Sequence, residues 1–329
     1  MLSQLRDALS NEHKIIQRLV FRLAKKYIAG YTLSSVLQEV RTNSTKGIKT
    51  TVTFLNEGAV DAVRAKYNAN TYVQFVKQAS RLHLSANVSV RLSQIGIRLN
   101  DGVLDKCMGD ILLASNASSG MVWIEAENGI QMEELFEQYR RFRQKNAEVG
   151  MEIPIWYPLE VQTIKRYLKR GDTVKLTSYS YTERKAAAAE EVAEEGTYRH
   201  LMSKVGRKEK GSKPPKIKNM LQYYVSDIGK LLQAGVSVAV LDHDEELVAR
   251  LAGFSKEYKK NLIFELPLGY SKGWLNKLVK MKVNLGIYTP YGKDLAPYII
   301  NKLTVTHGKI RTIATKVLDG NLEGFYDEE

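Results

Sequence analysis

The sequence is poor in cysteine and proline, and it lacks any long apolar run. Its 329 residues include one cysteine, Cys107, and 7 prolines. A single cysteine excludes an internal disulfide and a multi-cysteine metal site. No apolar stretch reaches the roughly 18 residues that a membrane-spanning helix needs. Residues 1–16 carry charges where a signal peptide has its apolar core, so we expect a soluble, cytoplasmic protein.

Positive charge is in excess: 49 Lys and Arg stand against 36 Asp and Glu, which gives a net charge of +13. Over half of this excess lies in the basic segment 199–218, which also contains glycine and proline. One interpretation is a solvated loop, and another is attraction to an anionic membrane face or to nucleic acid. The chain has no nucleic-acid-binding motif, which argues against a nucleic-acid partner.

The spacing of apolar residues changes along the chain. Residues 1–45 have helical spacing, with a helix that starts at Thr32 or Ser34 and ends near Asn43. Amphipathic helices are predicted between most of the later apolar runs, for example over 132–150 and 244–260. Eight short apolar or β-branched runs predict strands at 50–55, 87–92, 121–126, 153–157, 173–179, 236–241, 261–266 and 283–288.

Eight strands alternating with helices over about 240 residues predict a (β/α)8 barrel. A doubly wound sheet is the alternative, but no glycine-rich phosphate turn follows the first strand. We expect an N-terminal helical segment over 1–45, and a barrel over 46–329 with a charged helix and loop inserted at about 184–218.

In such a barrel, functional side chains lie at the C-terminal ends of the strands. Arg91 and Glu125 fit either a structural ion pair or a catalytic pair, and His243 fits either a helix cap or a functional group. The neighbouring acids leave a metal open but unspecific. The polar residues at the strand ends are Asn56, Glu57, Arg91, Glu125, Glu127, Tyr157, Tyr179, Tyr181, Asp242, His243, Asp244, Glu265, Tyr288 and Tyr291.

Eight motifs occur in a fixed order along nearly the whole chain. They are AKKYIAGYTLSSVLQEV (24–40), TVTFLNEG (51–58), NVSVRLSQIGI (87–97), WIEAEN (123–128), KLTSYSYTE (175–183), LDHDEELV (241–248), FELPLGY (264–270) and IYTPYGKDLAPYIINKL (287–303). Together they resemble the monofunctional proline dehydrogenases, flavin-dependent barrel enzymes that oxidise proline to pyrroline-5-carboxylate. The last motif is the most specific, and the resemblance implies that its helix lies over the barrel mouth.

The resemblance implies FAD as the cofactor and hydride transfer from an amino acid substrate, with electrons passed on to a quinone or another acceptor. It implies no metal. The basic segment 199–218 then becomes a hypothesis for peripheral contact with the inner membrane face. The implied catalytic residues are Arg91, Glu125 and Tyr288. The implied substrate contacts are Tyr181, Tyr298, Asn301 and Lys302. The implied FAD contacts are Lys175, Thr177, Tyr179, Asp242, His243 and Glu265.

Several of these positions depart from the family pattern. Asn301 and Lys302 stand where paired arginines grip the substrate carboxylate, and a lysine offers a point charge instead of a planar fork. The resemblance therefore leaves three readings open: proline oxidation, oxidation of a related cyclic amine, and a flavin-free barrel that acts as a binding scaffold. The other substitutions are Arg91 for lysine, Glu125 for aspartate, Ile155 for glutamine, Lys175 for arginine, Ser178 for lysine, Asp242 for threonine and Glu265 for glutamine.

Overall fold

The computed structural model describes residues 26–118, 120–127, 130–146, 148–154, 161–177, 217–242, 245–254, 257–269 and 271–293. Apart from Lys26, they all belong to one of the two compact units into which the chain divides, Tyr27–Ser178 with Lys208–Lys293. The expected insertion at 184–218 and the expected final helix lie largely or wholly outside the described residues. The domain boundaries therefore stay a prediction.

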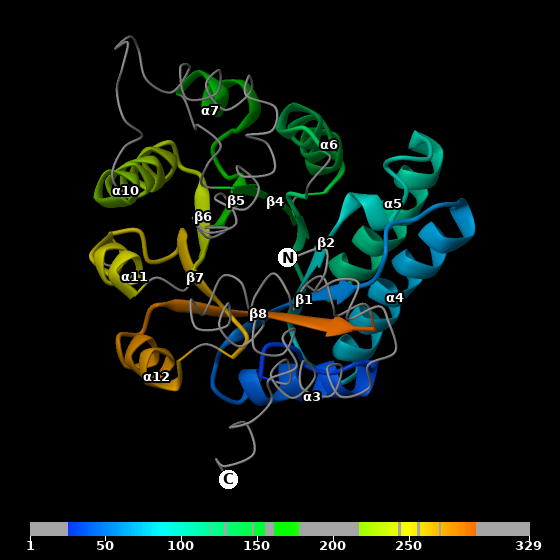
Figure 1. Cartoon of the computed structure of the whole chain (residues 1–329), viewed down its shortest axis with the longest axis horizontal. Coiled ribbons are helices and arrows are strands. Elements are labelled where there is room, and N and C mark those ends of the chain that lie inside the picture. The colour runs from blue at the N-terminus through cyan, green and yellow to red at the C-terminus, as the bar shows by residue number, and fades with distance from the viewer. Residues whose placement is uncertain are drawn as a thin grey trace, which may run out of the picture. The chain divides into compact units, whose positions relative to one another are not determined.

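Eight parallel strands pair in chain order and close into a barrel, which confirms the (β/α)8 fold (Figure 1). The barrel closes where β8 pairs with β1, with Thr51 opposite Tyr288. The strands are β1 (Lys49–Leu55), β2 (Ala86–Val90), β3 (Val122–Ile124), β4 (Val149–Pro154), β5 (Thr173–Thr177), β6 (Ser237–Leu241), β7 (Leu262–Pro267) and β8 (Asn284–Gly292).

Helices surround the barrel, and one joins each consecutive pair of strands (Figure 1). Before β1, helix α3 (Leu33–Ser44) contacts β1 and β8. Thr32 caps α3 because its side chain accepts the Ser35 N–H at 3.2 Å, so the helix begins after Thr32. The joining helices are α4 (Ala62–Arg81), α5 (Asp101–Asn116), α6 (Met132–Lys145), α7 (Val161–Tyr167), α10 (Ile217–Gln233), α11 (Glu245–Ala252) and α12 (Lys272–Lys280); the short 3-10 helix η1 (Leu92–Gln94) precedes α5.

Side chains alternate along each strand between the helix layer and the barrel lumen. Most of the positions that face the helices are apolar and form the core, among them Val52, Val88, Ile124, Met151, Val174, Val240 and Phe264. The alternate positions, which face the lumen, include the buried polar residues Thr51, Thr53, Ser89, Glu152, Lys175, Thr177 and Glu265. The sheet therefore keeps its apolar contacts outside the barrel and encloses a polar lumen.

Several expected boundaries were wrong, among them those of one strand and two helices. The fourth strand was expected at 153–157, but it is β4, which starts at Val149 because Gly150 pairs with Trp123 of β3. The helix expected over 132–150 ends at Lys145, since Asn146 is extended, with φ −153°. The helix expected over 244–260 ends at Ala252.

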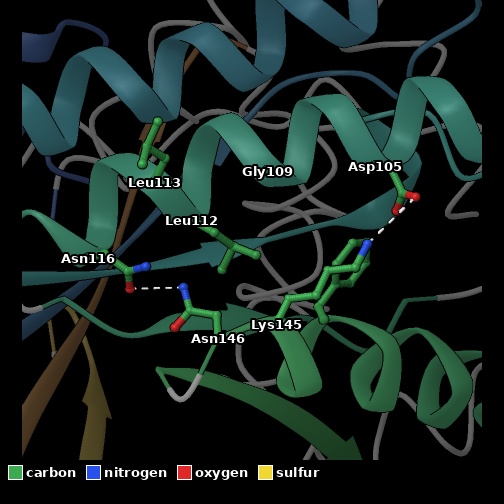
Figure 2. Close-up of a pocket in the computed structure, with 8 residues that line it drawn as sticks. Asp105, Gly109, Leu112, Leu113, Asn116, Lys145 and Asn146 are labelled. Atoms are coloured by element: carbon green, nitrogen blue, oxygen red, sulfur yellow. Dashed lines mark hydrogen bonds and ion pairs between the residues drawn. The ribbon is translucent and has the colours of Figure 1, made fainter.

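A groove of about 270 Å³ lies between α5 and α6 on the outside of the barrel (Figure 2). Leu112 and Phe142 are among its lining residues, and Asn146 donates to Asn116 at 2.8 Å at one end of the groove. Gly109 lies in the middle of α5, and a methyl group added there would meet no atom within 4 Å. In the part of the chain that the structure describes, no helix is long and apolar enough to cross a membrane.

Two glycines provide a matched pair of tests. A Cβ on Gly150 would lie 2.5 Å from the Trp123 ring, so we expect Gly150→Ala to lower the free energy of unfolding by about 1–3 kcal/mol through overpacking. Gly109→Ala should raise the free energy of unfolding by up to about 1 kcal/mol, because alanine has a higher helix propensity than glycine at an exposed helical position. Urea denaturation measures both changes. A Gly150→Ala variant with an unchanged free energy of unfolding would contradict the packing of Trp123 over β4.

Candidate active site

The centre of the lumen holds a buried ion pair between β5 and β7. Lys175 Nζ lies 2.5 Å from Glu265 Oε2, and the Lys175 side chain is 0% exposed. Both atoms are buried, so each is the main partner of the other in a site that excludes water. The other carboxylate oxygen of Glu265 accepts a hydrogen bond from the Thr51 hydroxyl. The pair is thus enclosed by strands on opposite sides of the barrel.

Aromatic rings surround the Lys175 ammonium. Its Nζ lies 4.6 Å from the centroid of the Trp123 ring and 5.4 Å from that of Tyr288. Both rings present an electron-rich face to the cation, and this attraction strengthens where water is absent. Gly150 leaves the space that the Trp123 ring fills. The lumen therefore stabilises the ammonium by one carboxylate and two rings.

A second buried carboxyl group, that of Glu152, faces Lys175 in the β4–β5 register. Burial raises the pKa of Glu152 to about 8; the Glu125 carboxylate adds to this rise, and the Lys175 charge opposes it. Glu152 Oε2 accepts the Ala126 N–H at 3.3 Å. At neutral pH Glu152 is therefore mostly protonated, which leaves Glu265 as the counter-ion of Lys175.

At the barrel mouth, Arg91 and Glu125, which directly follow β2 and β3, come together with Tyr288 of β8. Tyr288 donates its hydroxyl hydrogen to Glu125 Oε1 at 2.8 Å, and Arg91 Nε lies 4.0 Å from Glu125 Oε2. Arg91 Nη2 also donates to the carbonyl oxygens of Phe54 at 3.4 Å and Asn56 at 3.1 Å. The Arg91 side chain remains 31% exposed, so it is the least buried side chain of this group that has an ionic partner.

Glu127 anchors the loop that carries Arg91. Its carboxylate accepts the backbone N–H of Ser93 at 2.9 Å and the Ser93 hydroxyl. Burial raises the pKa of Glu127, although both hydrogen bonds oppose the rise. Glu127 therefore links the segment that follows β3 to η1, which follows β2.

The structure brings Lys175, Glu265, Arg91, Glu125 and Tyr288 into the lumen and mouth. Tyr288 was expected at the end of the last strand, but β8 continues to Gly292, so it lies mid-strand. Thr177 ends β5, and its buried hydroxyl interacts with the Glu152 carboxyl group, which opposes the rise of the Glu152 pKa. The remaining expected residues, outside the described part of the chain, are Tyr179, Tyr181, His243, Tyr298, Asn301 and Lys302.

Asp242 follows β6 directly and is buried. Its N–H donates to Glu265 O at 3.3 Å, which extends the ladder of β6 with β7. The alternation along β6 places Asp242 on the side of Val240, toward the helices. Burial, and after it the Asp242 carboxylate, raises the pKa of Tyr224 on α10. Asp242 is therefore close enough to α10 to act on a helix side chain.

Sequence reasoning missed Glu152 and Trp123 as lumen residues. The signal for Glu152 is a lone acid inside an otherwise apolar strand, in VGMEIP. The signal for Trp123 is weaker, because a tryptophan in a strand usually belongs to the core. Among the described residues, no three His, Cys, Asp or Glu side chains are grouped so as to hold a metal ion.

A closed (β/α)8 barrel with charged residues at its mouth defines a class of proteins that bind small molecules at the strand ends. No model of a known protein family matches the sequence. The chain is 21% identical over 283 residues to proline dehydrogenase 1 and 22% identical to proline dehydrogenase 2 of Bacillus subtilis, which covers 85% of this chain and of each relative. It is 21% identical over 320 residues to the proline dehydrogenase of Deinococcus radiodurans, 94% of both chains. The resemblance is confirmed: the chain is a divergent relative of these proteins.

Solved structures share the fold. Proline utilization A from Bdellovibrio bacteriovorus, inactivated by N-propargylglycine, matches 91% of this chain with a TM-score of 0.70 and 14% identity. Proline utilization A from Corynebacterium freiburgense matches 92% with a TM-score of 0.66 and 12% identity. This chain spans about a third of the length of those chains, 34% and 32%.

The lumen ion pair predicts a non-additive effect on stability. Glu265→Leu leaves the Lys175 ammonium buried without a counter-ion, so the free energy of unfolding should fall by about 3–5 kcal/mol. Adding Lys175→Met should recover most of this loss. Urea denaturation of the two single variants and the double variant measures the coupling between the two residues. The control is Glu246→Leu, which breaks the exposed Arg250–Glu246 pair and should change the free energy of unfolding by less than about 1 kcal/mol. A Glu265→Leu variant as stable as wild type would contradict the pairing.

Glu152 predicts a dependence of stability on pH. Between its ordinary pKa near 4.5 and the folded value of about 8, the folded state holds a proton that the unfolded state has lost. Its contribution to stability therefore falls as pH rises through this window, by at most about 1.4 kcal/mol per pH unit. Glu152→Gln should be more stable than wild type at pH 8 and converge with it near pH 5. Parallel stability curves in urea would contradict the raised pKa.

Proposed function

We propose that this protein is a flavin-dependent oxidoreductase that oxidises proline, or a related cyclic amine, to the corresponding imine. The observation that carries the proposal is the Arg91–Glu125–Tyr288 group at the mouth of a barrel whose relatives are named proline dehydrogenases. With proline as substrate, the product is pyrroline-5-carboxylate. With FAD bound, a quinone or another acceptor would take up the electrons that the substrate loses.

The lumen residues fit an isoalloxazine ring. Three buried polar atoms lie in the lumen: Lys175 Nζ and Glu265 Oε2, which pair with each other, and Thr177 Oγ1. A flavin has ring nitrogens and carbonyl oxygens that accept hydrogen bonds and one N–H that donates, so two donors and one acceptor match its polar edge. We therefore infer that Lys175, Thr177 and Glu265 hold FAD. Tyr179, Asp242 and His243 are the further contacts implied by the sequence resemblance.

The residues at the mouth have separate roles in binding the substrate and in orienting it. When bound, the flavin supplies a hydride acceptor for the substrate carbon next to nitrogen. Arg91 binds the substrate carboxylate through Nη1, because its Nη2 is already committed to two carbonyl oxygens. Glu125 balances the charge of Arg91 and fixes the Tyr288 hydroxyl. The face of the Tyr288 ring lies toward Lys175, so this ring separates Arg91 and Glu125 from the lumen ammonium.

The remaining roles fall to residues outside the described part of the chain. We propose that Tyr181 and Tyr298 shape the substrate pocket and that Lys302, beside Asn301, supplies a second positive charge for the carboxylate. The basic segment 199–218 is proposed as a peripheral contact with an anionic membrane, where a quinone acceptor would be found. Protection of this segment from protease by anionic vesicles tests the contact.

The visible spectrum of the purified protein, supplied with FAD and then with proline under anaerobic conditions, tests the function. Flavin bands near stoichiometry that are bleached by proline support it. A yellow protein that responds only to another cyclic amine narrows the substrate to that amine. A colourless protein that cannot be reconstituted overturns the oxidoreductase and leaves the barrel as a binding scaffold.

Arg91 provides the sharpest variant for this reaction. Arg91→Met removes the charge that binds the substrate carboxylate, so KM for proline should rise about 10- to 100-fold. Arg91→Lys keeps the charge and should retain more of the activity. Steady-state kinetics with an artificial electron acceptor measures both variants. An unchanged KM in Arg91→Met would assign the carboxylate to another residue.

A further inference from the structure

Gln94, a fully buried residue of η1, shares its hydrogen-bond acceptors with Arg91. Its amide nitrogen donates to the carbonyl oxygens of Phe54 and Asn56, at 2.8 Å to each. These are the same two oxygens that accept hydrogen bonds from Arg91 Nη2. Each carbonyl oxygen has two lone pairs, so one can serve the amide and the other the guanidinium.

A buried network fixes the orientation of the Gln94 amide. Tyr72 donates its hydroxyl hydrogen to Gln94 Oε1 at 2.9 Å, and the same hydroxyl oxygen accepts the N–H of Phe54 at 3.3 Å. Asn68 donates its side-chain N–H to the backbone carbonyl oxygen of Gln94 at 2.9 Å, and its side-chain oxygen accepts a hydrogen bond from the Asn56 amide at 2.7 Å. The side chains of Asn68 and Tyr72 are buried as well. The amide therefore has its oxygen toward Tyr72 and its nitrogen toward the end of β1.

We propose that Gln94 is a positioning residue, which aims the Arg91 guanidinium at the substrate by holding the carbonyl oxygens of Phe54 and Asn56. Gln94 touches neither the lumen ion pair nor Tyr288 in the described contacts, and it acts only through Arg91. The inference rests on the proposed function, since Arg91 is taken to bind the substrate carboxylate. It adds a residue, on the turn behind the mouth, that determines how well the carboxylate is bound.

Steady-state kinetics of the FAD-loaded protein tests this role. Gln94→Leu keeps most of the volume but removes both donors, so the carbonyl oxygens and the guanidinium lose their fixed positions. KM for proline should rise about tenfold or more while kcat changes less than about twofold, because binding is affected and hydride transfer is not. Gln94→Glu, which replaces the donor by an acceptor facing two carbonyl oxygens, should raise KM at least as much.

Two controls separate positioning from folding. Asn43→Leu removes another buried amide, which donates to Thr50 Oγ1 at 3.3 Å on the far side of β1, so it should lower stability without moving KM. Tyr72→Phe frees the Gln94 oxygen but keeps both amide donors, so it should raise KM by only about two- to fivefold. If Gln94→Leu does not fold, Tyr72→Phe provides the test instead, and an unchanged KM there overturns the proposal.

The results distinguish this inference from the proposed function. If proline reduces the flavin of the wild-type protein but KM is unchanged in Gln94→Leu, only the positioning role is overturned. An equal rise of KM in Asn43→Leu and Gln94→Leu assigns the effect to general destabilisation and also overturns it. A wild-type protein that neither binds proline by calorimetry nor is reduced by it overturns the proposed function, and the inference with it.

Discussion

A lysine ammonium without access to water lies in the middle of the barrel, and much of the lumen is arranged around it. An isolated buried charge is very costly, so Lys175 on β5 needs the carboxylate that Glu265 supplies from β7. Thr51 on β1 binds the second oxygen of that carboxylate, and the rings of Trp123 and Tyr288 face the ammonium. Five strands thus contribute to one cation, which accounts for a lumen lined with polar and aromatic side chains where other barrels use branched apolar ones.

Tyr288 connects the lumen to the mouth. Its ring faces Lys175 at 5.4 Å, and its hydroxyl donates to Glu125, which is itself 4.0 Å from Arg91. A ligand that displaces this one side chain would therefore change the surroundings of both positive charges. The raised pKa of Glu152 matters for the same reason, because a second ionised carboxylate beside Lys175 would compete with Glu265 for the ammonium.

The alternation of apolar and polar residues was sufficient to predict the barrel, because most helix-facing positions are apolar, with Thr50 and Thr289 as exceptions. It placed β4 wrongly, since Glu152 interrupts the apolar run and moves the visible pattern toward 153–157. The proximity of Arg91 and Glu125 could be expected, because they follow or end neighbouring strands. The pairing of Lys175 with Glu265 could not, since the residues lie 90 positions apart and no local pattern records a contact across the lumen. Six of the expected site residues lie outside the described part of the chain, so their roles rest on the sequence resemblance.

The replacement of a family lysine by Arg91 has a physical consequence in this setting. A guanidinium has five N–H donors in a fixed plane, whereas an ammonium is a point charge with three. Arg91 can donate to the carbonyl oxygens of Phe54 and Asn56 and still present donors to a carboxylate. A planar group is useful only if its plane is fixed, and Gln94 fixes the two oxygens that set it. Nη1 of Arg91 is thus the group that can meet a carboxylate from the end of β2, in place of the paired arginines that the chain lacks at Asn301 and Lys302, provided that the turn behind Arg91 stays rigid.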